Sequence, residues 1–265
     1  MNIRGRPRTL AAIIALSGLL ATLSAGGAAR AEAGAQADAR TDARTDDCAT
    51  PSEMTETEAK LPHLAERLRA HQPVAIVAIG GASTIGRAAG SPDLSYPRRL
   101  GQDLQRDFPD SPITVINKGV PRQSARQMFE RFATDVFAED PVMVVWEVGI
   151  TDAVRGTDID EFAQTLQEGV EQLKNRAVDT MFVDMQFSRS SATVINFEAY
   201  LKALHRVGDL GDIFVFPRYA MMRYWSEQKM FNFDDVAEED RAKLAARVYD
   251  CLGRKMADII QRAVR

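Results

Sequence analysis

The sequence predicts an α/β protein, a three-layer α/β/α sandwich built around a five-stranded parallel sheet. From residue 74 onward, five short apolar runs alternate with segments of helical periodicity. The first run, 74–79, is continuously apolar, as expected of a strand that is buried on both faces. The chain has 265 residues, of which 45% are hydrophobic and 26% charged. These values exclude a wholly disordered chain and a protein with many membrane spans.

The first 31 residues have the pattern of a secretory signal peptide. A short basic segment, 1–9, precedes an uncharged apolar run at 10–25, and Ala29-Arg30-Ala31 fits a cleavage site. The apolar run is shorter than the roughly 20 residues of a spanning helix, although an uncleaved anchor is the alternative. We therefore expect export to a bacterial periplasm or beyond, with no membrane span after cleavage.

Residues 32–52 are predicted to be a linker, and residues 53–265 to be the folded domain. The stretch 32–50 lacks large apolar side chains and cannot bury a core face. The chain has a net charge of −4, and its first 31 residues hold four arginines and no acid, so the remainder is more acidic still. A nucleic-acid partner is therefore not expected, because such proteins need a basic face.

Within the domain the elements follow one another in regular order. A helix with three leucines on one side is predicted at 53–70. The five strands are predicted at 74–79, 113–116, 142–146, 181–184 and 213–216, and the later helices at 96–108, 124–137, 162–173, 197–207 and 240–264. In an open parallel sheet, ligands bind at the carboxyl ends of the strands, so the loops that follow the strands are the candidate site.

The two cysteines are predicted to form a disulfide. Cys48 precedes the domain and Cys251 lies in the last helical segment. In an oxidising compartment two thiols are more often paired than free, and this bridge would fasten the N-terminal arm to the last helix; two unpaired thiols are the alternative. Cysteine and histidine spacings typical of zinc sites are missing from the sequence, so we expect no metal and no cofactor.

Four short motifs resemble the blocks of the SGNH/GDSL hydrolases, a family of esterases and lipases. They are GGAST at 80–84, NKG at 117–119, GITD at 149–152 and, less closely, DRAK at 240–243. The resemblance covers about residues 73–262 and implies a flavodoxin-like SGNH hydrolase fold. It also implies ester hydrolysis by a serine nucleophile, a histidine base oriented by an aspartate, and oxyanion donors from a serine, a glycine and an asparagine.

The residues at the matching positions depart from that catalytic set. Ala82 stands where the family has its nucleophile, and the neighbouring Ser83 is either a replacement nucleophile or a turn serine that bonds local backbone. Gly119 is retained as an oxyanion donor. Thr151 replaces the asparagine, and its hydroxyl has a shorter reach.

The predicted base is also replaced. Asp240 and Lys243 occupy the aspartate and histidine positions. A lysine with a pKa near 10.4 is a poor base at neutral pH, and the aspartate beside it favours a salt bridge. Registers that start from Asp234 or Asp235 supply no histidine either.

Two functions from different classes follow. One is an exported ester hydrolase that acts on O-acyl groups of envelope carbohydrate or lipid through Ser83. The other is a non-catalytic module that binds a glycan or an envelope protein at the same strand ends. In both, Asp152 is expected to be mainly structural, and Arg122 either faces the cleft or is a solvated surface residue. The ligand expected from the resemblance is a carbohydrate or an acyl ester, and the sequence does not determine the oligomeric state.

Overall fold

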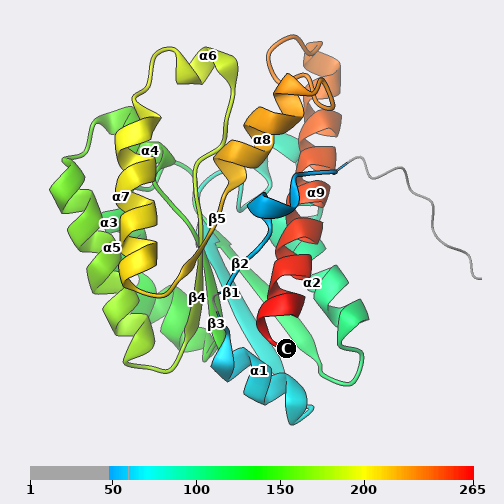
Figure 1. The fold of residues 1–265 in the computed structure, drawn as a ribbon, viewed down its shortest axis with the longest axis vertical. Helices are drawn as coiled ribbons and strands as arrows, with labels where there is room; N and C mark the ends of the chain where they lie inside the picture. The colour runs from blue at the N-terminus through cyan, green and yellow to red at the C-terminus, as the bar shows by residue number, and fades with distance from the viewer. Residues whose placement is uncertain (1–47, 59) are drawn as a thin grey trace, which may run out of the picture. The chain divides into compact units, whose positions relative to one another are not determined.

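A computed structural model describes residues 48–58 and 60–265 (Figure 1). The predicted signal peptide and most of the predicted linker lie outside these described residues. Among the described residues, no helix combines the length and the apolar character needed to cross a membrane.

The predicted five-stranded parallel sheet is confirmed. Its strands are β1 (Val74–Gly80), β2 (Ile113–Gly119), β3 (Met143–Glu147), β4 (Asp179–Val183) and β5 (Phe214–Phe216). All neighbouring pairs are parallel, in the order β2-β1-β3-β4-β5. The register pairs Gly80 with Gly119 and Ile79 with Trp146, so the loops after β1, β2 and β3 leave the sheet side by side.

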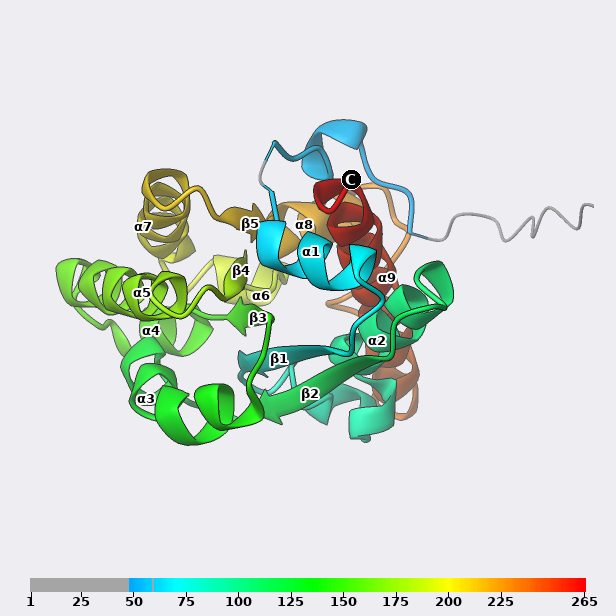
Figure 2. The same ribbon diagram turned by 90° about the horizontal axis from the view of Figure 1, so that it is seen from below.

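Helices cover both faces of the sheet (Figure 2). On one face lie α1 (Pro62–Arg69), α2 (Tyr96–Asp107), α8 (Arg218–Glu227) and α9 (Arg241–Ala263). On the other lie α3 (Ala125–Glu130), α5 (Ile159–Lys174) and α7 (Phe197–Leu210). Two short helices, α4 (Ile150–Arg155) and α6 (Arg189–Ala192), follow β3 and β4 beyond their carboxyl ends (Figure 1).

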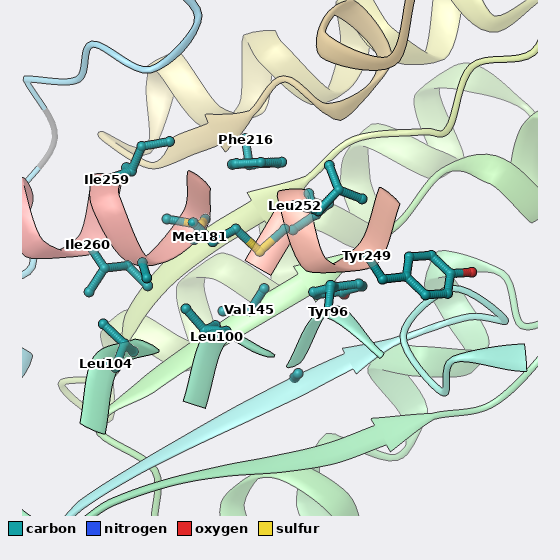
Figure 3. Packing of buried hydrophobic residues seen from close by; sticks show 14 of the residues in the cluster. Tyr96, Leu100, Leu104, Val145, Met181, Phe216, Tyr249, Leu252, Ile259 and Ile260 are labelled. Carbon is teal, nitrogen blue, oxygen red and sulfur yellow. The ribbon is translucent and has the colours of Figure 1, made fainter. Parts of the chain in front are cut away.

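The core on the α2 and α9 side is shown in Figure 3. Leu100 and Leu104 of α2 face Leu252 and Ile260 of α9, and all four are almost fully buried. Side chains from the sheet, among them Met181, complete the cluster. Each buried aliphatic side chain of this kind contributes roughly 1.5–3 kcal/mol to folding, so this helix pair anchors the C-terminal segment to the sheet.

Two predicted helices differ from the structure. The prediction of a helix at 53–70 is wrong over its first half. A 3₁₀ turn forms at Ser52–Met54, and α1 begins only at Pro62. A residue that precedes proline is disfavoured in the helical region, and Leu61 has ψ 72°. The helix expected at 124–137 is also interrupted, because α3 ends at Glu130 and a π-helical turn, Phe132–Val136, follows it.

The predicted disulfide is confirmed. Cys48 and Cys251 are bonded, with their Cα atoms 5.3 Å apart. The segment next to Cys48, which we expected to belong to the linker, is attached to the domain, because Trp225 Nε1 of α8 donates a hydrogen bond of 2.9 Å to the Ala49 carbonyl oxygen.

Candidate functional site

A cavity of about 380 Å³ lies at the carboxyl ends of β1 and β3, where the sequence predicts the site. Its size is within the range of small-ligand sites. The loop after β1, residue 122 beyond β2, helix α4 and residue 186 beyond β4 form its walls. The lining residues are Ala82, Ser83, Arg122, Glu147, Ile150, Thr151, Val154, Arg155 and Gln186.

The loop after β1 turns tightly around a buried carboxylate. Glu147, the last residue of β3, is 2% exposed and accepts hydrogen bonds from the Thr84 backbone N–H (3.0 Å) and the Thr84 hydroxyl. A Cβ on Gly80 would lie 2.1 Å from Thr84 Oγ1, so only glycine fits at the start of the turn. This carboxylate fixes the loop that carries Ala82 and Ser83.

A buried arginine balances Glu147. Arg218, the first residue of α8, is 1% exposed, and its Nη2 lies 3.1 Å from Glu147 Oε1. On the other side Tyr96 shares a hydrogen bond of 2.8 Å with the Thr84 hydroxyl. Burial, followed by the Glu147 charge, raises the pKa of Tyr96 far above its usual range, so this phenol stays protonated. The cavity floor thus holds a buried polar network in which the charges of Glu147 and Arg218 offset each other.

Ser83 and Ala82 both reach the cavity but differ in exposure. Ala82, which we predict to occupy the nucleophile position, is exposed, whereas Ser83 is 5% exposed. The Ser83 hydroxyl donates to Gln186 Oε1 at 3.2 Å and is also hydrogen-bonded to the Tyr249 side chain. Tyr249 points its hydroxyl away from the apolar cluster in Figure 3. Burial raises the pKa of Tyr249, so it is no base for Ser83 at neutral pH.

All three histidines of the chain lie away from this cavity. The ring of His63 on α1 is 2.8 Å from Asp179 at the start of β4, at the opposite end of the sheet. His71 occupies a left-handed turn after α1, with φ 51°. His205 on α7 lies 3.5 Å from the buried Asp184 and lines other hollows. Among the described residues, the cavity that holds Ser83 therefore has no imidazole in its wall.

The structure does not bring Asp240 and Lys243 to Ser83. Both are exposed, and Lys243 lines a separate hollow beside Phe231 and Cys251. The two positions precede or begin α9, whereas Tyr249, further along the helix, is the residue that reaches Ser83. The motif match therefore leads to α9, the helix that contributes Tyr249 next to Ser83. The matched positions themselves, Asp240 and Lys243, lie at its exposed N-terminal end, away from the cavity.

The two predicted oxyanion donors, Gly119 and Thr151, have different surroundings. The Gly119 N–H donates to its neighbour Asn117 Oδ1 at 2.9 Å. A Cβ on Gly119 would come 2.4 Å from the Ile85 nitrogen, so this glycine permits the close approach of β2 to the loop after β1. Thr151 lines the cavity, and together with Ser83 it supplies the hydroxyls of the wall.

Asp152, which we expect to be mainly structural, is not among the residues that line the cavity. It is 1% exposed, and its two carboxylate oxygens lie 3.2 and 3.0 Å from the nitrogen of Ala125, the first residue of α3. Burial raises the pKa of Asp152 to about 6, against the lowering effect of the Ala125 N–H. Asp152 thereby joins α4 to α3 behind the cavity wall.

Arg122 lines the cavity. This is the first of the two alternatives for this residue, the other being a solvated surface arginine. Its backbone is left-handed, with φ 66°, a conformation that costs a non-glycine residue about 1–2 kcal/mol. Its carbonyl oxygen accepts a hydrogen bond of 2.8 Å from Arg155 Nη2. In the described part of the chain, no cluster of three or more histidine, cysteine, aspartate or glutamate side chains is arranged to hold a metal ion.

Sequence reasoning missed Glu147, Arg218, Gln186 and Arg155. Glu147 had a signal, since it is an acid at the end of the apolar run 142–146. Its partner Arg218 is 71 positions away. Only the fold brings these two together.

The sandwich, with its cavity at the ends of β1 and β3, agrees with the SGNH/GDSL-type hydrolase fold that the sequence motifs resemble. The chain belongs to the Non-GDSL lipase-like family, whose model matches residues 47–265. No curated protein matches it.

Solved structures share the fold at low sequence identity. A two-domain esterase (CEX) active on acetylated mannans, co-crystallised with mannopentaose, is 17% identical with a TM-score of 0.61, over 77% of this chain and 55% of that one. A variant of Axe2, an acetyl xylan esterase from Geobacillus stearothermophilus, is 20% identical with a TM-score of 0.57, over 71% and 94%. A protein of the G-D-S-L family from Desulfitobacterium hafniense DCB-2 is 21% identical with a TM-score of 0.56, over 70% and 99%.

Proposed function

We propose that this protein is an exported, non-catalytic member of the SGNH/GDSL-type esterases whose strand-end cavity binds an O-acylated carbohydrate. One observation carries the proposal: none of the described residues that line the cavity of Ser83 is a histidine. The three histidines of the chain lie elsewhere, two of them beside aspartates. Without a base a serine hydroxyl stays protonated and is a weak nucleophile.

Two further residues support the proposal. Ala82, exposed to the cavity at the family's nucleophile position, has no group that could form an acyl intermediate. Ser83 is 5% exposed and its hydroxyl donates to Gln186, an arrangement suited to holding the loop. Losing a triad member leaves only the modest acceleration due to binding and oxyanion contacts.

The proposed ligand class comes from the scaffold. Two of the solved structures similar to this chain are described as an esterase active on acetylated mannans and an acetyl xylan esterase. The wall of the cavity combines the apolar side chains of Ala82, Ile150 and Val154 with hydroxyl and amide groups of Ser83, Thr151 and Gln186. Such a mixture suits an acyl methyl group next to sugar hydroxyls.

The second candidate function is ester hydrolysis through Ser83. It is favoured by the position of the Ser83 hydroxyl in the cavity wall. The purified chain and Ser83→Ala should be assayed with p-nitrophenyl acetate and titrated with acetylated mannopentaose by calorimetry. We expect both proteins to hydrolyse the ester at the same background rate and to bind the oligosaccharide. Turnover that Ser83→Ala abolishes would establish the hydrolase, and failure to bind any O-acylated oligosaccharide, neutral or anionic, would refute the module.

Export is supported by the N-terminal pattern of residues 1–31 and by the Cys48–Cys251 disulfide, since such bonds persist in oxidising compartments. Cell fractionation of a bacterial host with N-terminal sequencing tests it. We expect a chain outside the cytoplasm that begins after Ala31.

A further inference from the structure

The charges around the strand-end cavity are unevenly distributed. Among the described residues, the single acid in its wall is Glu147, which is buried and neutralised by Arg218 at 3.1 Å. The cations in the wall are Arg122 and Arg155, both exposed. The cavity therefore has an excess of positive charge in a chain whose net charge is −4.

These two arginines differ from their neighbours in having no carboxylate ion-pair partner among the described residues. Arg126 pairs with Glu168 at 2.8 Å and Arg131 with Asp135 at 2.6 Å, on the same side of the molecule. Arg155 instead donates to two uncharged acceptors, Arg122 O at 2.8 Å and Gln127 Oε1 at 3.0 Å. It acts on the buried Asp152 only at longer range, lowering its pKa against the larger effect of burial.

Arg155 also serves as a brace for Arg122. By holding the carbonyl oxygen of a left-handed residue, it fixes the backbone from which the Arg122 side chain enters the cavity wall. A strained residue of this kind persists only where its surroundings hold it, and such residues cluster at ligand sites. A guanidinium placed in this way, with no acid of its own among the described residues, matches the planar geometry of a carboxylate or the oxygens of a sulfate.

We propose that the cavity is selective for anionic saccharides, with Arg122 contacting the acidic group and Arg155 acting as a positioning residue. This inference rests on the proposed function and narrows its ligand class. The apolar patch formed by Ala82, Ile150 and Val154 takes the acyl group, while Arg122 takes the carboxylate or sulfate of the same or the neighbouring sugar. Neutral acetylated mannans and xylans would then be the weaker ligands.

Calorimetry with the full chain tests this inference. The probes are an acetylated oligogalacturonate, a sulfated oligosaccharide of equal length and acetylated mannopentaose. We expect one of the anionic probes to bind at least about tenfold more tightly than the neutral one in roughly 0.05 M salt. This advantage should shrink in roughly 0.5 M salt, because screening shortens the range of the arginine charge. The better of the two anionic probes identifies the acidic group.

Arg122→Gly is the most informative variant, because glycine accepts the left-handed backbone and the fold should be retained. We expect it to lose the tenfold preference, because its affinity for the anionic probe should fall more than its affinity for the neutral one. Arg122→Lys should keep part of the preference. The control is Arg223→Ala, which removes an exposed arginine paired with Glu227 on α8 and should change nothing.

The outcomes separate this inference from the proposed function. Equal affinity for anionic and neutral probes, or a preference that survives Arg122→Gly, would overturn the anionic selectivity and leave the carbohydrate-binding module intact. Binding of none of the three probes would overturn both.

Discussion

The pair formed by Glu147 and Arg218 shows how individual residues keep the site in shape. Both side chains are at most 2% exposed, and burying two charges costs several kcal/mol unless their geometry is good and their other bonds are made. Glu147 meets this condition, because the loop after β1 gives it the Thr84 N–H and the more distant Gly81 N–H at 3.4 Å. Arg218 meets it only in part, because its Nη2 lies 3.1 Å from Glu147 Oε1 while its Nε and Nη2 make no hydrogen bond within the described part of the chain. The hydrogen bonds to Glu147 order the loop that carries Ala82 and Ser83.

At the same scale, Asp152 should give the protein a measurable pH dependence. Its pKa is raised to about 6 in the folded state, from about 3.9 in the unfolded chain. Because the folded pKa is raised, the protonated side chain favours the folded state. This stability is fully present below about pH 4 and is lost as the pH rises to about 6, since the unfolded chain releases the proton first. Asp152→Asn stays neutral and still accepts the Ala125 N–H. We expect this variant to gain on the wild type by up to about 2–3 kcal/mol above pH 6, with near equality at pH 4.

Guanidinium unfolding of both proteins at pH 4, 5, 6 and 7 checks this expectation. Taking the difference between the two curves removes the contribution of every other titrating group. The matched control is Asp160→Asn, at an exposed carboxylate in the first turn of α5. If the difference curve for Asp152→Asn is as flat as that of the control, the burial of this carboxylate does not control acid stability.

At the scale of elements, α5 can pack closely against Trp146 of β3 because it has a glycine, Gly169, at the point of contact. A Cβ on Gly169 would lie 2.5 Å and 2.7 Å from two ring atoms of Trp146. Trp146 is held by Phe132 and Phe182, whose ring centroids are 4.9 and 5.5 Å away, so it cannot retreat easily. This packing brings α5 close to the sheet behind the cavity.

Gly169→Ala should therefore destabilise the protein although alanine is the better helix former. We expect a loss of about 1–3 kcal/mol, typical of an overpacked core, measured as a lower midpoint of chemical unfolding. Gln167→Ala, on the exposed side of the same helix, should be neutral or slightly stabilising. A stabilised Gly169→Ala would mean that helix propensity outweighs the contact with Trp146.

At the scale of the whole molecule, the Cys48–Cys251 disulfide joins two segments 203 positions apart. It holds the segment around Cys48 against α9. Trp225 of α8 holds the same segment by donating a hydrogen bond to the Ala49 carbonyl oxygen. A cross-link over so long a stretch restricts the unfolded chain strongly.

The double variant Cys48→Ser/Cys251→Ser should lose about 2–5 kcal/mol of stability. Reductant should lower the unfolding midpoint of the wild type to that of the double variant, and should leave the double variant unchanged. A wild type that is indifferent to reductant during unfolding would show that the bridge does not contribute to stability.

The sequence by itself determined the scaffold. The apolar run 142–146 has the length and composition of a buried strand, and the residues that follow the first three strands lie at one edge of the sheet because parallel strands must end there. Helix boundaries were harder to predict, because a leucine pattern such as that of 53–70 continues through Leu61, whereas Pro62 decides where α1 begins.

The tertiary structure alone decided which side chains share the cavity. The sequence aligned Asp240 and Lys243 with the family's catalytic pair, but Tyr249 reaches Ser83, and Arg218 reaches Glu147 from 71 positions away. Local pattern determines strand and helix because it reflects which faces of an element are buried, both faces for these strands and one for most helices. The lining of the cavity depends on how the helices pack and how the turns are bent. Both are set by many contacts between residues far apart in the chain, and the spacing of residues along the sequence does not reveal these contacts.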